Sequence, residues 1–107
     1  MAKYLLKASY STEGIKGVLK EGGSGRAAAV DQLIKSVGGK VEAFYFAFGD
    51  NDVYIIADLP DNASAAAVAA AVTSAGALSS YETTVLLTPA EIDEAVKKAV
   101  SYRPPGG

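Results

Sequence analysis

Two apolar segments joined by four turn-forming residues are the feature that most constrains this chain. Residues 41–48 and 53–59 are rich in aromatic and β-branched side chains, and residues 49–52 read Gly-Asp-Asn-Asp. Apolar segments of this length on either side of such residues predict a β-hairpin. If the two middle residues form the turn, Phe48 pairs with Val53, and directly paired residues share one face of the sheet. The register therefore assigns each side chain of the hairpin to a face.

One face of the predicted hairpin is dry and suits packing against helices, whereas the other is mixed in character. The dry face comprises Phe44, Phe46, Phe48, Val53, Ile55, Ala57 and Leu59. The mixed face comprises Ala43, Tyr45, Ala47, Tyr54, Ile56 and Asp58. The same division on a first strand over residues 3–9 places Tyr4, Leu6 and Ala8 under the helices and leaves Lys3, Leu5 and Lys7 on the mixed face. A fourth strand over residues 81–87 adds Glu82, Thr84 and Leu86 to the mixed face.

Helix signals fill the intervals between the predicted strands. One helix begins at residues 11–14, runs for barely two turns and is broken by the Gly-rich residues 21–25. Ser24 is a suitable N-cap for a second helical segment, which the two glycines at 38–39 end. After the hairpin, an Ala-rich helix is expected over residues 63–75.

The last helix has the clearest start signal. Thr88 is a suitable N-cap, Pro89 occupies the first helical position and Glu91 completes a capping box. Residues 104–107, Pro-Pro-Gly-Gly, are expected to form a C-terminal tail. Because no internal repeat or long linker divides the chain, residues 1–103 are predicted to form a single domain.

The resulting order, β-α-β-β-α-β with one extra C-terminal helix, predicts an α+β fold of the ferredoxin-like type. Both helices of such a fold pack on one face of a four-stranded antiparallel sheet. The mixed face is too apolar to be left in water and too polar for an ordinary core. We therefore expect a homodimer that packs sheet against sheet as a dimeric α/β barrel, and the alternative is a monomer with a solvated sheet face.

Composition removes several classes of function. The 107 residues include no Cys and no His, which excludes thiolate nucleophiles, Ser-His-Asp catalysis and most zinc or copper sites. Ten Lys and Arg against twelve Asp and Glu leave a net charge of −2, without the basic field that a nucleic-acid or anionic-membrane partner needs. No apolar run is long enough for a signal peptide or a membrane-spanning helix. We expect a cytoplasmic, bacterial protein with neither a metal nor a cofactor.

Four segments resemble the GYD domain family, namely residues 10–17, 39–52, 87–91 and 102–106. Residues 39–52 are the most specific of these. The Gly-x-Tyr-Asp-like element that names the family corresponds to Gly49 and Asp52, with Asn51 where tyrosine is expected. The resemblance implies a dimeric α/β-barrel protein of ferredoxin-like fold and indicates no particular chemistry.

Four polar side chains on the mixed face form the candidate ligand site: Lys7, Tyr45, Tyr54 and Asp58. Dimerisation would enclose them, and the tyrosine rings beside a Lys and a carboxylate suit a small polar or aromatic compound. Tyr and Asp also perform acid–base chemistry where burial shifts their pKa values. A binding or purely structural homodimer is therefore the first hypothesis, and a cofactor-independent enzyme acting on a small organic molecule is the alternative.

Three further segments each have a functional and a structural interpretation. Residues 49–52 could bind a hard cation through oxygen ligands, but they equally suit a turn. Residues 20–26 place Arg26 in a Gly-rich stretch entering a helix, where a phosphate or carboxylate could bind. This stretch lacks the spacing of a phosphate-binding loop and equally suits a break between helices. Residues 102–105 could be a docking peptide or could lie along the body of the protein or along a neighbouring subunit.

Overall fold

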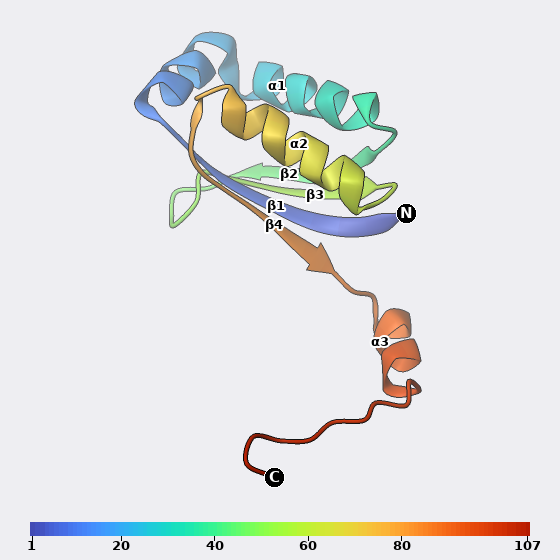
Figure 1. Cartoon of the computed structure of the whole chain (residues 1–107). Coiled ribbons are helices and arrows are strands. Elements are labelled where there is room, and N and C mark those ends of the chain that lie inside the picture. Colours follow the sequence, from blue (N-terminus) through green and yellow to red (C-terminus); the bar gives the residue numbers. More distant parts are fainter.

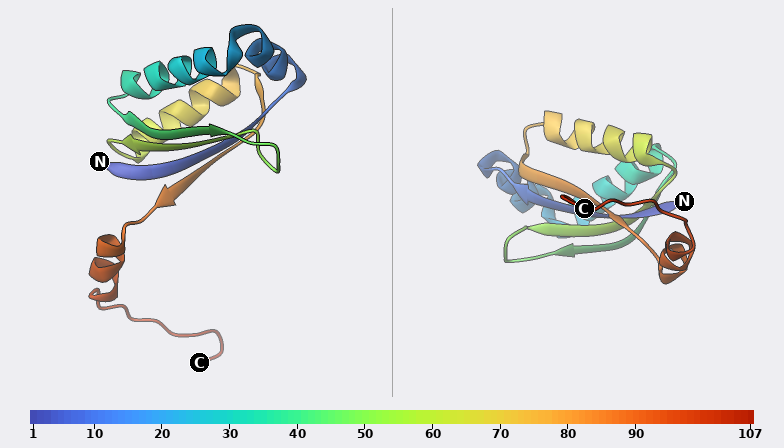
Figure 2. Two further views of the ribbon diagram at one scale, coloured as in Figure 1. Left: turned by 180° about the vertical axis from the view of Figure 1, so that it is seen from behind. Right: turned by 60° about the horizontal axis from the view of Figure 1, so that its bottom comes forward.

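The computed structural model describes residues 1–107 as four strands and three helices (Figure 1). The strands are β1 (Ala2–Tyr10), β2 (Lys40–Phe46), β3 (Val53–Leu59) and β4 (Leu78–Leu86). They form one antiparallel sheet in the order β2-β3-β1-β4. Helices α1 (Thr12–Ser36) and α2 (Asn62–Ser74) cover the same face of this sheet, and α3 (Pro89–Val96) follows β4 (Figure 2). The α+β, ferredoxin-like arrangement expected from the sequence is confirmed.

The predicted hairpin forms, but its turn is longer than two residues. Phe46, not Phe48, pairs with Val53, and residues 47–52 form the connecting loop. The backbone N–H of Asp52 donates to a β1 carbonyl at 2.9 Å, and its carboxylate accepts from a β1 N–H at 2.9 Å. Asp52 is therefore held by β1 and cannot close a tight turn. The observed pairing therefore differs from the predicted one by two residues. Because side chains on a strand alternate between faces with a period of two, residues of β2 and β3 keep their predicted faces. The prediction is wrong for residues 47 and 48, which lie in the loop.

Helix α1 has a single interruption. Ser11 caps its start by accepting a hydrogen bond from the N–H of Gly14 at 3.1 Å. Gly22 alone is non-helical, with φ 83° and ψ 163°, a region that only glycine adopts without strain. The predicted break is thus confirmed, but the helix has resumed before Ser24, so the prediction of Ser24 as an N-cap is wrong. Gly38, with φ 82°, follows the helix in the left-handed conformation expected of it.

The hydrophobic core lies between the covered face of the sheet and the two helices. The buried hydrophobic residues are Tyr4, Leu6 and Ala8 of β1, Val53, Ile55, Ala57 and Leu59 of β3, Ile34 of α1, and Ala65 and Val68 of α2. These strand residues are the ones that the sequence assigned to the helix-covered face. The Tyr4 hydroxyl donates to Oδ1 of Asn62 at 2.6 Å, which ties β1 to the start of α2.

The C-terminal segment projects away from the sheet as an arm, which we define as residues 87–107 (Figure 1). The predicted capping box at its start is confirmed, because the Thr88 hydroxyl accepts from the N–H of Glu91 and the Glu91 carboxylate accepts from the N–H of Thr88. No residue of α3 is buried. The radius of gyration is 16.9 Å, whereas a compact chain of this length would have about 13 Å. The arm accounts for this excess.

Candidate functional site

The uncovered side of the sheet, called the open face below, carries three rows of residues that run across all four strands. The first row holds Lys40, Asp58, Lys3 and Leu86; the second holds Ala43, Ile56, Leu5 and Thr84; the third holds Tyr45, Tyr54, Lys7 and Glu82. The middle row is largely apolar, and the outer two rows carry the charges. Most of these side chains are only partly exposed, although no helix covers them.

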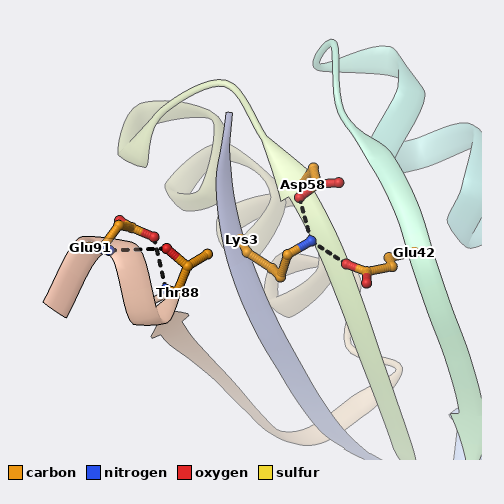
Figure 3. A network of polar contacts seen from close by, with 5 residues as sticks. All are labelled: Lys3, Glu42, Asp58, Thr88 and Glu91. Carbon is orange, nitrogen blue, oxygen red and sulfur yellow. Dashed lines mark hydrogen bonds and ion pairs between the residues drawn. The ribbon is translucent and has the colours of Figure 1, made fainter. Parts of the chain in front are cut away.

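Lys3 is the centre of a polar network at one end of the open face (Figure 3). Its Nζ donates to Oδ1 of Asp58 at 2.9 Å and also to Oε2 of Glu42. Glu42 reaches Lys3 because β2 has an irregular register between Val41 and Ala43. The hydrogen bond to Glu42, followed by that to Asp58, raises the pKa of Lys3 above its ordinary value. The network holds one positive charge between two negative charges.

Lys7 is paired separately at the other end of the open face. Its Nζ lies 2.9 Å from Oε1 of Glu82 on β4. Glu82 raises the pKa of Lys7, with a smaller contribution from Tyr54, and Lys7 in turn lowers the pKa of Glu82. The two directions agree, so both groups are held in their charged forms.

The structure brings together three of the four candidate ligand-site residues. Tyr45, Tyr54 and Lys7 are neighbours in the third row, and Tyr45 is 70% exposed. Asp58 lies in the first row, with the apolar middle row between it and Lys7. Its partner is Lys3, which the sequence placed on the open face but did not include in the candidate site.

The three other segments singled out in the sequence hold no cluster of metal-ligating side chains. In residues 49–52, Asp52 is tied to β1, and no group of three or more acidic side chains is placed to hold a metal ion. In residues 20–26, Gly22 forms the interruption of α1, and Arg26 lies with Nε 3.3 Å from Oε1 of Glu21. Residues 102–105 lie exposed in the arm and do not follow the body of the protein (Figure 1).

A cavity of about 240 Å³ lies on the other side of the sheet, beneath the helices. Its walls come from all four strands and from α1 and α2, and Arg26 is its one charged lining residue. Tyr10 and Tyr81 also line it, and burial raises the pKa of both. Sequence reasoning selected Arg26 as an anion-binding candidate but missed the two tyrosines. Side chains alternate between the two faces along each strand, and this alternation places Tyr10 and Tyr81 on the helix-covered face. It could have predicted that both tyrosines lie near Arg26 under the helices.

A second hollow, of about 540 Å³, lies where the interruption of α1 meets the hairpin loop. It is lined by Ile15, Leu19, Phe46 and Phe48 among others, and Phe48 and Leu19 are strongly exposed. None of the helices combines the length and the apolarity that crossing a bilayer requires.

Comparison with known proteins supports the fold. The family model for the GYD domain matches residues 4–96. Among solved structures, the crystal structure of MtbAldR is similar, with a TM-score of 0.54 and 15% sequence identity, over 81% of this chain and 52% of that one. The chain therefore spans about half the length of MtbAldR, and at this identity the likeness shows the fold alone. No curated protein matches the sequence.

Proposed function

We propose that this chain, which belongs to the GYD domain family, acts as a homodimer whose open faces pack against each other and enclose a small-ligand site. The observation that carries the proposal is the open face itself. Its apolar middle row lies between two rows in which every charged side chain except the exposed Lys40 already has a partner within the chain. Burying a paired charge costs much less than burying an unpaired one. The face is therefore suited to burial although it carries charged side chains.

The arm supports the same arrangement. Its exposed apolar side chains are Leu87, Ile92, Val96, Val100 and Tyr102. They begin where β4 leaves the sheet, beside the first row of the open face, and they make no buried contact with the arm's own domain. In a two-fold dimer the same surface of each copy covers the other. A second copy of this chain would cover both the arm and the middle row.

The ligand site is assigned to Tyr45, Tyr54 and Lys7, with Asp58 at the far side of the middle row. The two tyrosines are direct cross-strand neighbours, and Tyr54 lies beside Lys7. Their rings provide area and their hydroxyls provide polar contacts, which suits a small aromatic compound. Binding is favoured over catalysis because the Lys–Asp contact of the open face, between Lys3 and Asp58, is partly exposed and lines neither of the two cavities described above.

Light scattering at micromolar concentration tests the dimer. We expect twice the chain mass of 10.9 kDa. Ile56→Lys should give a folded monomer, because it places an unpaired charge in the buried middle row. Ala66→Lys, at an exposed position of α2 on the opposite side of the sheet, is the matched control and should remain dimeric. A monomeric parent protein, or a dimeric Ile56→Lys variant, would contradict the proposal.

Thermal shift with small aromatic metabolites tests the ligand site. A compound that stabilises the parent should lose most of its effect on the Tyr54→Phe, Asp58→Asn double variant, which removes a hydroxyl and a negative charge but keeps the ring and the volume. A compound that stabilises both proteins equally would place the site elsewhere.

A further inference from the structure

The cavity beneath the helices exists because α1 and α2 diverge over the sheet. Helix α1 packs mainly on β2, and α2 packs mainly on β4. The space above the two central strands is therefore shared between the helices and is not filled by either of them. Its floor is formed by Leu6 and Ala8 of β1 and by Val53 and Ile55 of β3.

The Ala-rich sequence of α2 keeps this space open. The residues of α2 that line the cavity include Val72 and Ala71, with Ala75 just after the helix. Alanine side chains are too short to reach across to α1. Ala71 and Ala75 line the cavity and are also exposed, so the cavity opens to solvent at the C-terminal end of α2.

Polar groups with unused hydrogen-bonding capacity lie among the apolar walls. Nε of Arg26 is buried without a hydrogen-bond partner, because Oε1 of Glu21 at 3.3 Å is too poorly aligned to accept from it. The hydroxyl of Tyr81 is also buried without a hydrogen bond of good geometry, although Thr83 is near enough to lower its pKa. Tyr10 is close enough to Arg26 for the positive charge to lower its pKa, against the larger effect of burial. Buried polar atoms without partners are rare and need an explanation.

We propose that this cavity binds a small monocarboxylic acid with an apolar tail. The tail lies over the central strands, and the carboxylate accepts hydrogen bonds from Arg26 and a tyrosine hydroxyl. An engineered cavity of about 150 Å³ holds benzene, so a cavity of this size has room for about ten non-hydrogen atoms. Octanoate has that size. The site lies on the opposite side of the sheet from the open face and does not depend on the function proposed for that face.

The charge of the cavity favours an acid over a neutral or cationic compound. Arg26 is always protonated and presents its donors in a fork that matches a carboxylate. Glu21 pairs with Arg26, with its Oε1 3.3 Å from Nε, and the side chain of Glu21 is 39% exposed. It can turn toward solvent when a carboxylate takes its place beside Arg26.

Isothermal titration of the full chain with octanoate tests the proposal, with octan-1-ol as a neutral compound that has the same tail. We expect saturable binding of octanoate at submillimolar concentration. Arg26→Gln should weaken octanoate binding at least tenfold and leave octan-1-ol binding unchanged. Lys20→Gln, which removes a positive charge from the same helix but does not line the cavity, should bind octanoate like the parent.

A second pair of variants tests the place of the tail. Val72→Phe fills the cavity and should abolish binding of both compounds, and Ala71→Leu does the same with a smaller change if the first variant does not fold. Circular dichroism establishes that each variant is folded. The proposal is wrong if the parent gives no saturable binding, if Arg26→Gln binds octanoate as the parent does, or if both filled variants retain binding.

Discussion

Gly14 of α1 packs tightly against Ala77, the residue before β4, and replacing Gly14 with alanine should destabilise the fold. A Cβ at this position would lie 1.9 Å from the carbonyl oxygen of Ala77 and 3.2 Å from Cδ1 of Tyr10. The carbonyl cannot simply move away, because it accepts a hydrogen bond from the N–H of Ser11 at 2.9 Å. The backbone of α1 and the segment before β4 must therefore separate.

The magnitude follows from three terms. Overpacking a close contact costs about 2 kcal/mol, and weakening the Ser11 hydrogen bond costs about 1 kcal/mol. Replacing glycine by alanine in a helix stabilises the helix by about 1 kcal/mol. We expect Gly14→Ala to lower the free energy of unfolding by about 2 kcal/mol.

Urea denaturation of Gly14→Ala and Gly17→Ala measures this effect against a matched control. Gly17 lies in the same helix, and a Cβ there would meet nothing within 4 Å. Gly17→Ala should therefore raise the free energy of unfolding by about 0.5–1 kcal/mol. The two identical substitutions have opposite expected signs. If Gly14→Ala is as stable as Gly17→Ala, α1 does not approach β4 as described.

Three further outcomes are expected. Gly22→Ala should lower stability by about 1 kcal/mol or more in urea denaturation, because φ is 83° and a Cβ is strained there although it meets no neighbour. Thr88→Ala should reduce the helical circular dichroism signal by fraying α3 without lowering the midpoint of the main unfolding transition, since α3 has no buried residue. Hydrogen bonds from the Ser64 hydroxyl and then its N–H lower the pKa of Asp61 from 3.8. Asp61→Ala should therefore have a lower free energy of unfolding than the parent at neutral pH. This difference should shrink as the pH falls below 3.8 through the lowered pKa, and a difference that stays the same in acid would contradict the prediction.

The fold could be predicted because its main signals are local. The capping box of Thr88 and Glu91 lies within four residues, and the alternation along a strand survives a register slip of two. The slip itself could not be predicted, because the hydrogen bonds between Asp52 and β1 join residues far apart in the sequence. The presence of a turn could be predicted, but its length could not.

The candidate site was less accessible to sequence reasoning for a related reason. Placing Lys7 and Asp58 on one face was correct, but their distance along that face depends on which residues pair across strands. The contact between Lys3 and Glu42 depends on the irregular register of β2 between Val41 and Ala43, which the residue pattern did not predict. The cavity near Arg26 depends on how two helices diverge, which is a property of packing and not of either helix alone.

The position of β1 has a consequence for how the protein is made. β1 precedes the other strands in the sequence and pairs with β3 and with β4. Its two edges therefore gain their hydrogen-bonding partners only after β3 and β4 have been synthesised. At synthesis rates of about 5–20 residues per second, β4 follows β1 by roughly 4–15 s. During that interval the apolar Tyr4-Leu5-Leu6 segment is an open strand edge, which can pair with another nascent chain. Lys3 and Lys7 flank this segment on both sides, where positive charges oppose such pairing until β4 arrives.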